Sequence, residues 1–205
     1  MPGRHTNHRP FARDKPIGPE DRARLENSVF GDHVALHFQD AEGTKQALAA
    51  LLRKADAQLL SDPEYRKEFG RWAGAGLFGN QWLVSKLGEV AMTRLPLADR
   101  IADAEMERLA SAPLVGLIST AADSSLDQLR AGQAYMRVAL MAERHDIRSQ
   151  PLSVLLRLDH TRSEVGKLFG IGARQAQHVF RMGYAEPESM RTRRRSLKEL
   201  TVGGP

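Results

Sequence analysis

The chain has 205 residues, 41% of them hydrophobic, which is enough to bury a core in a single domain, and no apolar run approaches the ~18 residues of a membrane span. It contains no cysteine, which excludes disulfides, thiolate catalysis and cysteine-ligated metal sites, and we expect a cytoplasmic protein. Thirty Lys and Arg residues against twenty-five Asp and Glu residues give a net charge of +5, too small to indicate nucleic-acid binding by itself.

The first part of the chain predicts helices around one strand. Residues 18–21 (Gly-Pro-Glu-Asp) begin a helix, since proline suits the first turn and acids favour the positive end of the helix dipole. Residues 33–38 alternate between polar and apolar side chains, which predicts a half-buried strand. Leucines at helical spacing follow from Thr44, and residues 61–64 (Ser-Asp-Pro-Glu) form a capping box that predicts a second helix.

The second helix carries an aromatic stripe, formed by Tyr65, Phe69 and Trp72. We expect these rings in the core, with the wall of a ligand pocket as the alternative. Residues 80–112 are predicted to be mostly helical, with an interruption near Pro96. This segment is a candidate lid over a site, or an excursion from the domain.

The second part of the chain predicts the centre of the sheet. Residues 113–120 form a short apolar run, which is typical of a strand buried on both faces. Residues 151–158 and 177–184 are two further predicted strands, separated by a short helix that begins at the capping box of residues 161–164. This order of helices and strands predicts one α+β domain over residues 1–205.

The helix after the central strand has two kinds of surface. One is an apolar stripe, as on a helix that packs against a core, formed by Leu126, Leu129, Met136 and Leu140. The other is a patch of small residues, Ala131, Gly132 and Ala134. Small residues in mid-helix indicate a close approach, here by another helix, a flavin ring or a dimer partner.

Two basic clusters lie near the ends of the chain, at residues 4–9 (Arg-His-Thr-Asn-His-Arg) and 191–195 (Arg-Thr-Arg-Arg-Arg). If the fold brings them together they form an anion site, because guanidinium groups bind phosphate bidentately. A solvated tail or a nucleic-acid contact is the alternative for the second cluster. No aromatic residues interleave with its arginines, which gives nucleic-acid binding little support.

The sequence predicts no metal site and no catalytic side chain. His33 and His37 would lie ~13 Å apart on a strand, too far to share a metal ion. The chain has no His/carboxylate cluster of ligand spacing. It also lacks a nucleophile elbow, a P-loop and a dinucleotide-binding glycine fingerprint.

Three motifs in order along the chain resemble one superfamily. They are residues 4–11 (Arg-His-Thr-Asn-His-Arg-Pro-Phe), residues 127–134 (Asp-Gln-Leu-Arg-Ala-Gly-Gln-Ala), and Arg-Met-Gly-Tyr at 181–184 followed by residues 192–197. On these motifs the chain resembles the nitroreductase-like flavoproteins, in particular the branch of mycobacterial Acg-type proteins and nitroreductase-like modules fused to ThiF-type domains. The resemblance implies an antiparallel mixed sheet flanked by helices, in an intertwined homodimer or as the matching half of a tandem protein, with flavin sites at the interface.

The resemblance also implies an FMN site. Arg4 and Thr6 match the phosphate motif, His8 occupies the place of its second arginine, and Arg194 or Arg195 is the C-terminal partner. His5 is placed near the ribityl chain or flavin edge, and the turn at residues 149–152 near the ring. The implied cofactor-binding residues are therefore Arg4, His5, Thr6, His8, Gln150, Pro151, Arg194 and Arg195.

The function implied by the resemblance is that of an FMN-dependent NAD(P)H oxidoreductase of nitroreductase type. In such a protein a nicotinamide reduces the flavin, which passes electrons to a nitro or quinone-like acceptor. The alternative is a non-catalytic module that stores flavin, or lacks it and acts in dimerisation or regulation. Two departures from the family favour that alternative: residues 26–32 lack its Pro-Ser-x-x-Asn motif, and His8 has no fixed charge at pH 7.

Overall fold

The structure is a computed structural model that describes residues 6–74 and 98–186. The strands in these residues are β1 (Val34–Gln39), β2 (Leu114–Thr120), β3 (Arg148–Pro151) and β4 (Gln175–Gly183). The helices are α1 (Pro19–Asn27), α2 (Glu42–Ser61), α3 (Pro63–Gly74), α5 (Ala98–Ala110), α6 (Ser125–Arg144), the 3-10 helix η1 (Ser153–Leu156) and α7 (Asp159–Phe169). The α+β class predicted from the sequence is confirmed.

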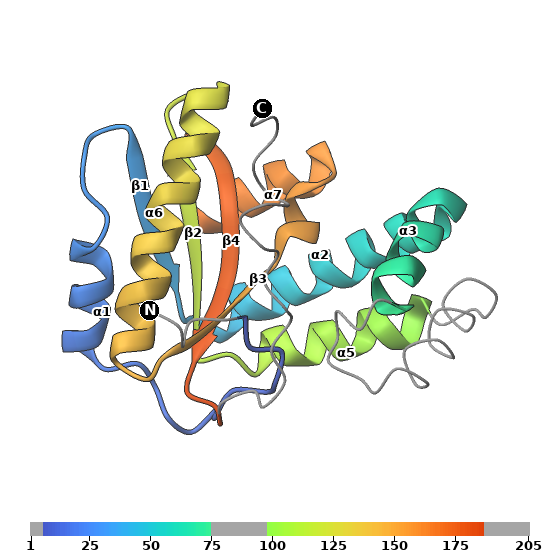
Figure 1. Cartoon of the computed structure of the whole chain (residues 1–205), viewed down its shortest axis with the longest axis horizontal. Helices are drawn as coiled ribbons and strands as arrows, with labels where there is room; N and C mark the ends of the chain where they lie inside the picture. The colour runs from blue at the N-terminus through green and yellow to red at the C-terminus, as the bar shows by residue number, and fades with distance from the viewer. Residues whose placement is uncertain (1–5, 75–97, 187–205) are drawn as a thin grey trace, which may run out of the picture.

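The strands form one antiparallel sheet in the order β1-β2-β4-β3 (Figure 1). The apolar run that predicted a central strand is β2, and every residue of β2 is buried. β1 and β4 lie within one or two residues of the predicted strands. The remaining strand, β3, pairs only with β4 among the described strands, and its Gln150 lies opposite Arg181.

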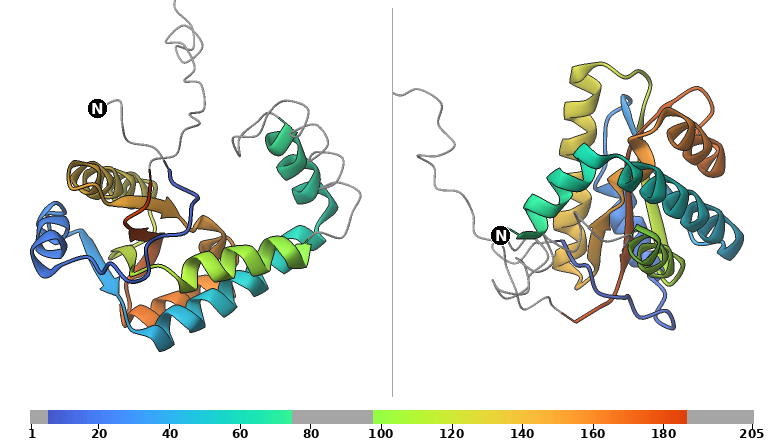
Figure 2. Two further views of the ribbon diagram at one scale, coloured as in Figure 1. Left: turned by 90° about the horizontal axis from the view of Figure 1, so that it is seen from below. Right: turned by 90° about the vertical axis from the view of Figure 1, so that its right-hand side faces the viewer.

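Helices cover both faces of the sheet (Figure 2). On one face, α1 and α6 pack against apolar side chains that include Ile118 and Phe180. On the other face, α2, α5 and α7 pack against side chains that include Leu117 and Val179. The two apolar clusters bury the side chains that point to opposite faces of each strand, as the alternation of a β-strand requires. None of the described helices is long and apolar enough to cross a bilayer.

The buried face of α6 is not its leucine stripe. The buried residues are Ala131, Ala134, Val138, Ala139 and Ala142. Leu126, Leu129 and Met136 are instead exposed by 53%, 59% and 42% of their surface. Four of these five residues are alanines, whose small side chains let the helix approach the bulky side chains of the sheet. The close approach predicted from the small residues is therefore an approach to the sheet.

The predicted strand at residues 151–158 is wrong in position. The chain is extended over β3, which ends at Pro151, and then turns through η1. The backbone N–H of Leu152 makes a last bond to the carbonyl of Val179 in β4 at 2.8 Å before the chain turns. Leu155 within η1 is fully buried in the core. The apolar residues at 151–158 are therefore explained by a buried 3-10 turn and not by a strand.

Two predicted helix starts are displaced by a residue or two. Ser61 is the last residue of α2, and Asp62 instead accepts a hydrogen bond from the backbone N–H of Glu64 at 2.9 Å. α7 begins at Asp159, and the hydroxyl of Thr161 donates to the carbonyl of Leu158 at 2.9 Å within its first turn. In both cases a helix does form where the capping signal predicted one.

The aromatic stripe of α3 is only partly in the core. The rings of Tyr65 and Phe69 stack with centroids 6.4 Å apart and are half-buried. Trp72 is 55% exposed, so the prediction of a core position is wrong for this residue. Of the candidate lid at residues 80–112, α5 is a helix that packs along α2, and residues 80–97 lie outside the described residues.

Candidate functional site

The N-terminal segment, residues 6–12, lies against the outer edge of the sheet. The backbone N–H of Asn7 donates to the carbonyl of Ser149 in β3 at 3.1 Å, and that of Ala12 donates to the carbonyl of Tyr184 at 2.8 Å. These bonds place the N-terminal motif beside the turn that follows β3. Gln150 and His8 are 142 residues apart in the sequence, yet their side chains are 3.1 Å apart.

Asn7 fixes this segment in place. Its side chain is fully buried. Its amide nitrogen donates to the carbonyl of Glu186 at 3.1 Å, and its amide oxygen accepts from the backbone N–H of Arg9 at 2.9 Å. Thr6 and Glu186, where the described chain begins and ends, therefore lie close together. The segments that carry the two basic clusters leave the described structure from one place.

Arg181 lies on β4 beneath the N-terminal segment and is fully buried. Its Nε donates to Oε1 of Gln150 at 2.6 Å, and its Nη2 donates to the carbonyl of Arg9 at 2.9 Å. The guanidinium also lies over the ring of Phe11, 4.1 Å from the centroid. Burial lowers the pKa of Arg181 to about 10, so the side chain still carries its charge at neutral pH.

The side chain of Gln150 joins Arg181 to His8. Its oxygen accepts from Arg181, which leaves its NH₂ group facing Nδ1 of His8 at 3.1 Å. An NH₂ group is a donor only, so Nδ1 of His8 is the acceptor. In a neutral imidazole that accepts at Nδ1, the proton lies on Nε2, which is then the ring's donor.

The opposite side of β3 is held by α6. The hydroxyls of Tyr135 and Ser149 are 3.2 Å apart, and the ring of Tyr135 packs on that of His178 with centroids 4.1 Å apart. His178 is largely buried, and its Nε2 has no hydrogen-bond partner among the described residues. Burial lowers the pKa of His178 to about 4, so the ring is neutral and belongs to the packing of this face.

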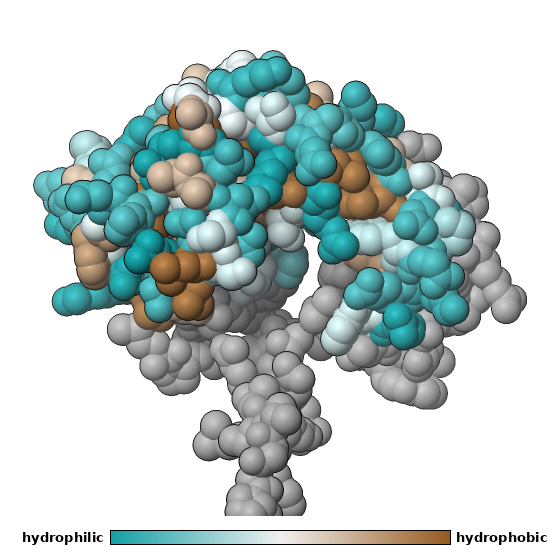
Figure 3. Space-filling model, turned by 90° about the horizontal axis from the view of Figure 1, so that it is seen from above, coloured by the Kyte–Doolittle hydropathy of each residue, from teal (hydrophilic) through white to brown (hydrophobic). Residues whose placement is uncertain are grey.

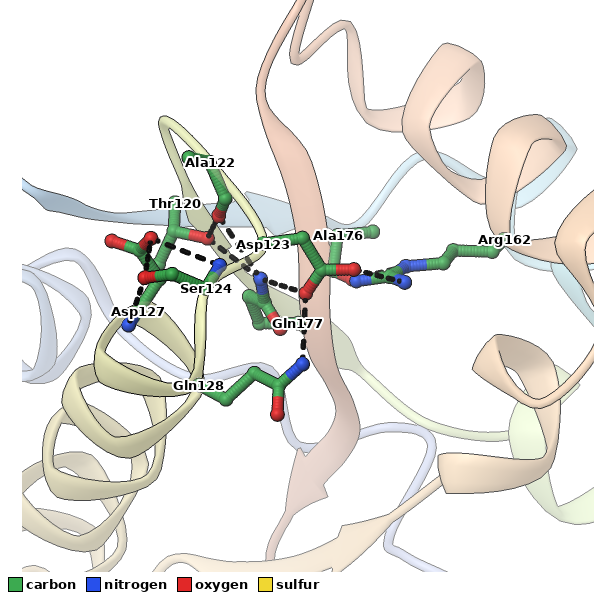
Figure 4. Close-up of polar contacts among 9 residues, drawn as sticks. All are labelled: Thr120, Ala122, Asp123, Ser124, Asp127, Gln128, Arg162, Ala176 and Gln177. Atoms are coloured by element: carbon green, nitrogen blue, oxygen red, sulfur yellow. Dashed lines mark hydrogen bonds and ion pairs between the residues drawn. The ribbon is translucent and has the colours of Figure 1, made fainter.

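A second polar cluster lies between the end of β2 and the start of α6 (Figure 4). Asp123 accepts from Arg162 at 2.8 Å, from Gln177 at 3.0 Å and from Gln128 at 3.1 Å. The bond from Arg162, with those from the two glutamines, holds the pKa of Asp123 well below its usual range. Because every described bond joins Asp123 to α6, α7 or β4, the cluster fixes these elements relative to one another.

Of the four predicted cofactor residues that the structure describes, His8 and Gln150 are in contact. Thr6 and His8 are half-buried in the N-terminal segment, and Gln150 and Pro151 end the strand beside it. Arg4, His5, Arg194 and Arg195 lie outside the described residues.

Sequence reasoning did not assign the anchoring roles of Asn7 and Arg181. A lone arginine in the otherwise apolar run at residues 179–182 was the available signal for Arg181. Among the residues that the structure describes, no group of three or more His, Asp or Glu side chains is arranged to hold a metal ion. His37 instead hydrogen bonds through Nε2 to the hydroxyl of Ser119 at 2.8 Å.

No family model and no curated protein matches the chain. Solved structures do match it over nearly its whole length. The FMN-dependent nitroreductase NfnB from Mycobacterium smegmatis, in complex with NADPH, is 19% identical with a TM-score of 0.66, covering 99% of this chain and 95% of that one. A nitroreductase with bound FMN from Bacteroides fragilis is 13% identical with a TM-score of 0.59, covering 98% and 95%. The NADPH:FMN oxidoreductase from Vibrio harveyi is 12% identical with a TM-score of 0.61, covering 98% and 74%. The chain therefore has the fold of the FMN-dependent nitroreductases.

Proposed function

We propose that this protein is an FMN-dependent NAD(P)H oxidoreductase of nitroreductase type that acts on nitro or quinone-like acceptors. The observation that carries the proposal is the position of the N-terminal motif. In a nitroreductase fold, Thr6 and His8 lie beside Gln150 and Pro151, where the two ends of the described chain also meet. A cytoplasmic location and membership of the branch of Acg-type and ThiF-fused proteins belong to the same proposal.

The donor set suits the phosphate of FMN. Residues 6–12 contain no acidic side chain, and His8 presents a ring N–H donor. In this proposal Arg4, Thr6 and His8 bind the phosphate together with Arg194 or Arg195, as the sequence resemblance implies. His5 lies near the ribityl chain or flavin edge, and Gln150 and Pro151 lie near the ring.

FMN would supply the redox chemistry, accepting a hydride and passing electrons on, while the protein binds and orients it. No side chain is assigned as a general acid or base. Gln150 is held from below by Arg181, and Ser149 contacts Tyr135 of α6, so the strand beside the proposed ring is supported on both faces. Such support keeps a cofactor site from loosening when its ligand is absent.

We also propose that the protein is a homodimer, with the outer face of α6 in the interface. Leu126, Leu129 and Met136 are exposed on this face, and Phe30 nearby is 67% exposed. Figure 3 shows brown apolar patches among the teal hydrophilic side chains on the half of the molecule that carries α6. Exposed apolar side chains gathered on one face mark an interaction surface.

The visible absorption spectrum tests the flavin proposal. Purified protein is measured before and after addition of FMN and desalting, and then assayed for NAD(P)H-dependent reduction of nitroaromatics and quinones. Retained flavin bands with turnover support the proposal, and a colourless protein that does not hold FMN contradicts it. The double variant Arg194→Ala, Arg195→Ala should lose flavin, whereas Arg24→Ala with Arg53→Ala removes the same charge elsewhere and should retain it.

The alternative is a non-catalytic flavin-storing module. The specific observation in its favour is His8, which offers a neutral donor where the family motif has a second arginine. Retained FMN without NAD(P)H oxidation above that of free FMN would support this alternative against the enzyme.

A further inference from the structure

The buried guanidinium of Arg181 is not explained by packing. None of its described hydrogen bonds goes to a carboxylate; its partners are the side chain of Gln150 and the carbonyls of Arg9 and Arg108. Glu105 lies near enough to act on Arg181 through its charge, but burial outweighs this attraction and lowers the pKa of Arg181. An apolar side chain of similar volume in such a position is often neutral or stabilising. The residue therefore has a task that an apolar side chain would not perform.

The partners of Arg181 come from three separate parts of the chain. Arg9 belongs to the N-terminal segment, Gln150 to β3, and Arg108 to the last turn of α5, whose carbonyl accepts at 3.4 Å. The guanidinium has a planar fork of donors, so bonds to several acceptors fix their relative positions. The ring of Phe11, 4.1 Å from the guanidinium, packs over it. Arg181 is thus the common support of the N-terminal segment and the end of β3.

The bond from Arg181 to Gln150 also decides which end of the amide faces His8. Arg181 has only donors, so it holds the amide oxygen of Gln150 and turns the NH₂ group toward Nδ1 of His8. This contact keeps Nδ1 unprotonated and leaves the proton on Nε2. Without Arg181 the amide would be free to rotate by half a turn, and both ring tautomers would be accessible.

We propose that Arg181 is a positioning residue of the phosphate site. Through the amide of Gln150 it holds His8 in the tautomer whose Nε2–H donates to the phosphate, and through the carbonyl of Arg9 it holds the segment that carries His8. This inference rests on the proposed binding of FMN. It accounts for a neutral imidazole in the place of an arginine, because an oriented N–H donor supports a phosphate without a charge of its own.

The test compares Arg181→Met and Gln150→Glu with the wild-type protein. A glutamate at position 150 would accept from Arg181 and also from the ring, so it should place a proton on Nδ1 of His8. Methionine at position 181 releases the amide and should give a mixture of tautomers. The imidazole ¹⁵N shifts of His8, measured in cofactor-free protein, report both changes directly.

Binding of FMN and of riboflavin, which lacks the phosphate, is measured on the wild type and Arg181→Met. In Arg181→Met, FMN affinity should fall by at least about tenfold, the factor expected for loss of one charge-assisted hydrogen bond, and riboflavin affinity should change little. Gln150→Glu is used for the tautomer comparison alone, because it places a new charge in the proposed cofactor site. Arg174→Met is the matched control, because Arg174 also bonds to a side chain and a carbonyl but at the opposite end of β4. It should leave His8 and both affinities unchanged.

The outcomes separate this inference from the proposed function. Wild-type protein that binds no FMN overturns the proposed function. The ¹⁵N shifts, measured without cofactor, then still test whether Arg181 sets the tautomer of His8. Wild-type protein that binds FMN, with an Arg181→Met variant that binds it equally or keeps the wild-type ring tautomer, overturns the role of Arg181. If Arg181→Met does not fold by circular dichroism, Gln150→Glu, which preserves side-chain volume, still tests by the ¹⁵N shifts whether the side chain at position 150 sets the tautomer of His8, and unchanged shifts overturn the proposal.

Discussion

Gly116 of β2 lies directly opposite Phe180 of β4, and the ring of Phe180 fills the space that a Cβ atom at Gly116 would need. The ring is fully buried and packs against Tyr135 of α6 with centroids 5.1 Å apart, so it has little room to move.

Gly116→Ala should therefore destabilise the protein by about 1–3 kcal/mol, the usual cost of overpacking a core. Urea unfolding followed by circular dichroism measures the change. Gly43→Ala is the control, since nothing lies within 4 Å of a Cβ at that position on α2. Equal midpoints for wild type and Gly116→Ala would contradict the packing described.

Asp56 on α2 should make the protein less stable as the pH rises. Its Oδ2 is buried without a partner among the described residues, and burial, with the nearby Glu105, raises its pKa to about 7. Between about pH 4 and 7 the folded state holds a proton that the unfolded state has released, so folding weakens with increasing pH.

Asp56→Asn removes this dependence. Its stability advantage over wild type should grow between pH 4 and 7 and be constant above, reaching on the order of 1–4 kcal/mol. Chemical unfolding at several pH values measures it. Asp103→Asn, on the exposed surface of α5 where Asp103 pairs with Arg53, should give a difference from wild type that does not grow over this range. A difference in unfolding free energy between Asp56→Asn and wild type that stays constant from pH 4 to 7 would show that the carboxyl of Asp56 ionises normally.

His178 should make the folded protein less stable at acidic pH. Because burial lowers its pKa to about 4, the unfolded chain takes up a proton below pH 6.5 that the folded state does not. Stability attributable to this group is therefore lost as the pH falls from about 6.5 to 4.

His178→Phe should remove that loss, since the new ring would pack with Tyr135 and Phe180 and does not titrate. Thermal unfolding at pH 7.5 and pH 5 measures the difference, which should be smaller in the variant than in wild type. His160→Gln, at an exposed position on α7, should leave the wild-type difference intact. An unaltered pH profile in His178→Phe would place the acid sensitivity elsewhere.

The outer face of α6 should control oligomeric state. Leu129→Glu with Met136→Glu puts two charges in the proposed interface and should raise the dimer dissociation constant at least about thirtyfold, as the loss of a buried anchor does. Light scattering over a dilution series measures it. Gln58→Glu, on the exposed side of α2, should not change the dimer. A monomeric wild-type protein would overturn the proposed interface.

Patterns of burial along one strand were readable from the sequence, and partners far along the chain were not. β2 was predicted because seven consecutive buried residues leave an apolar run. β3 was missed because Ser149 and Gln150 are polar, and their burial depends on Asn7 and Arg181. Those partners lie in other parts of the chain, beyond any local pattern.

The buried face of α6 was misjudged for a different reason. Hydrophobicity ranks Leu126 and Leu129 above the alanines, but the face that α6 turns to the sheet is made mostly of alanines, which allow a close approach. In the candidate site, the resemblance named His8 and Gln150, which the structure brings together. The supporting roles of Asn7 and Arg181 follow only from their hydrogen bonds in the folded chain.

The N-terminal segment that carries the proposed phosphate residues also covers the outer edge of β3 through Asn7 and Ser149. An uncovered strand edge is a template for pairing with a second chain, which leads to aggregation. Shortening the protein by its first ten residues would thus remove the proposed phosphate residues and expose that edge at the same time. If the proposed site binds flavin, solubility and cofactor retention are coupled in this molecule, and a truncated form that loses flavin has to be checked for self-association before the loss is ascribed to the binding residues.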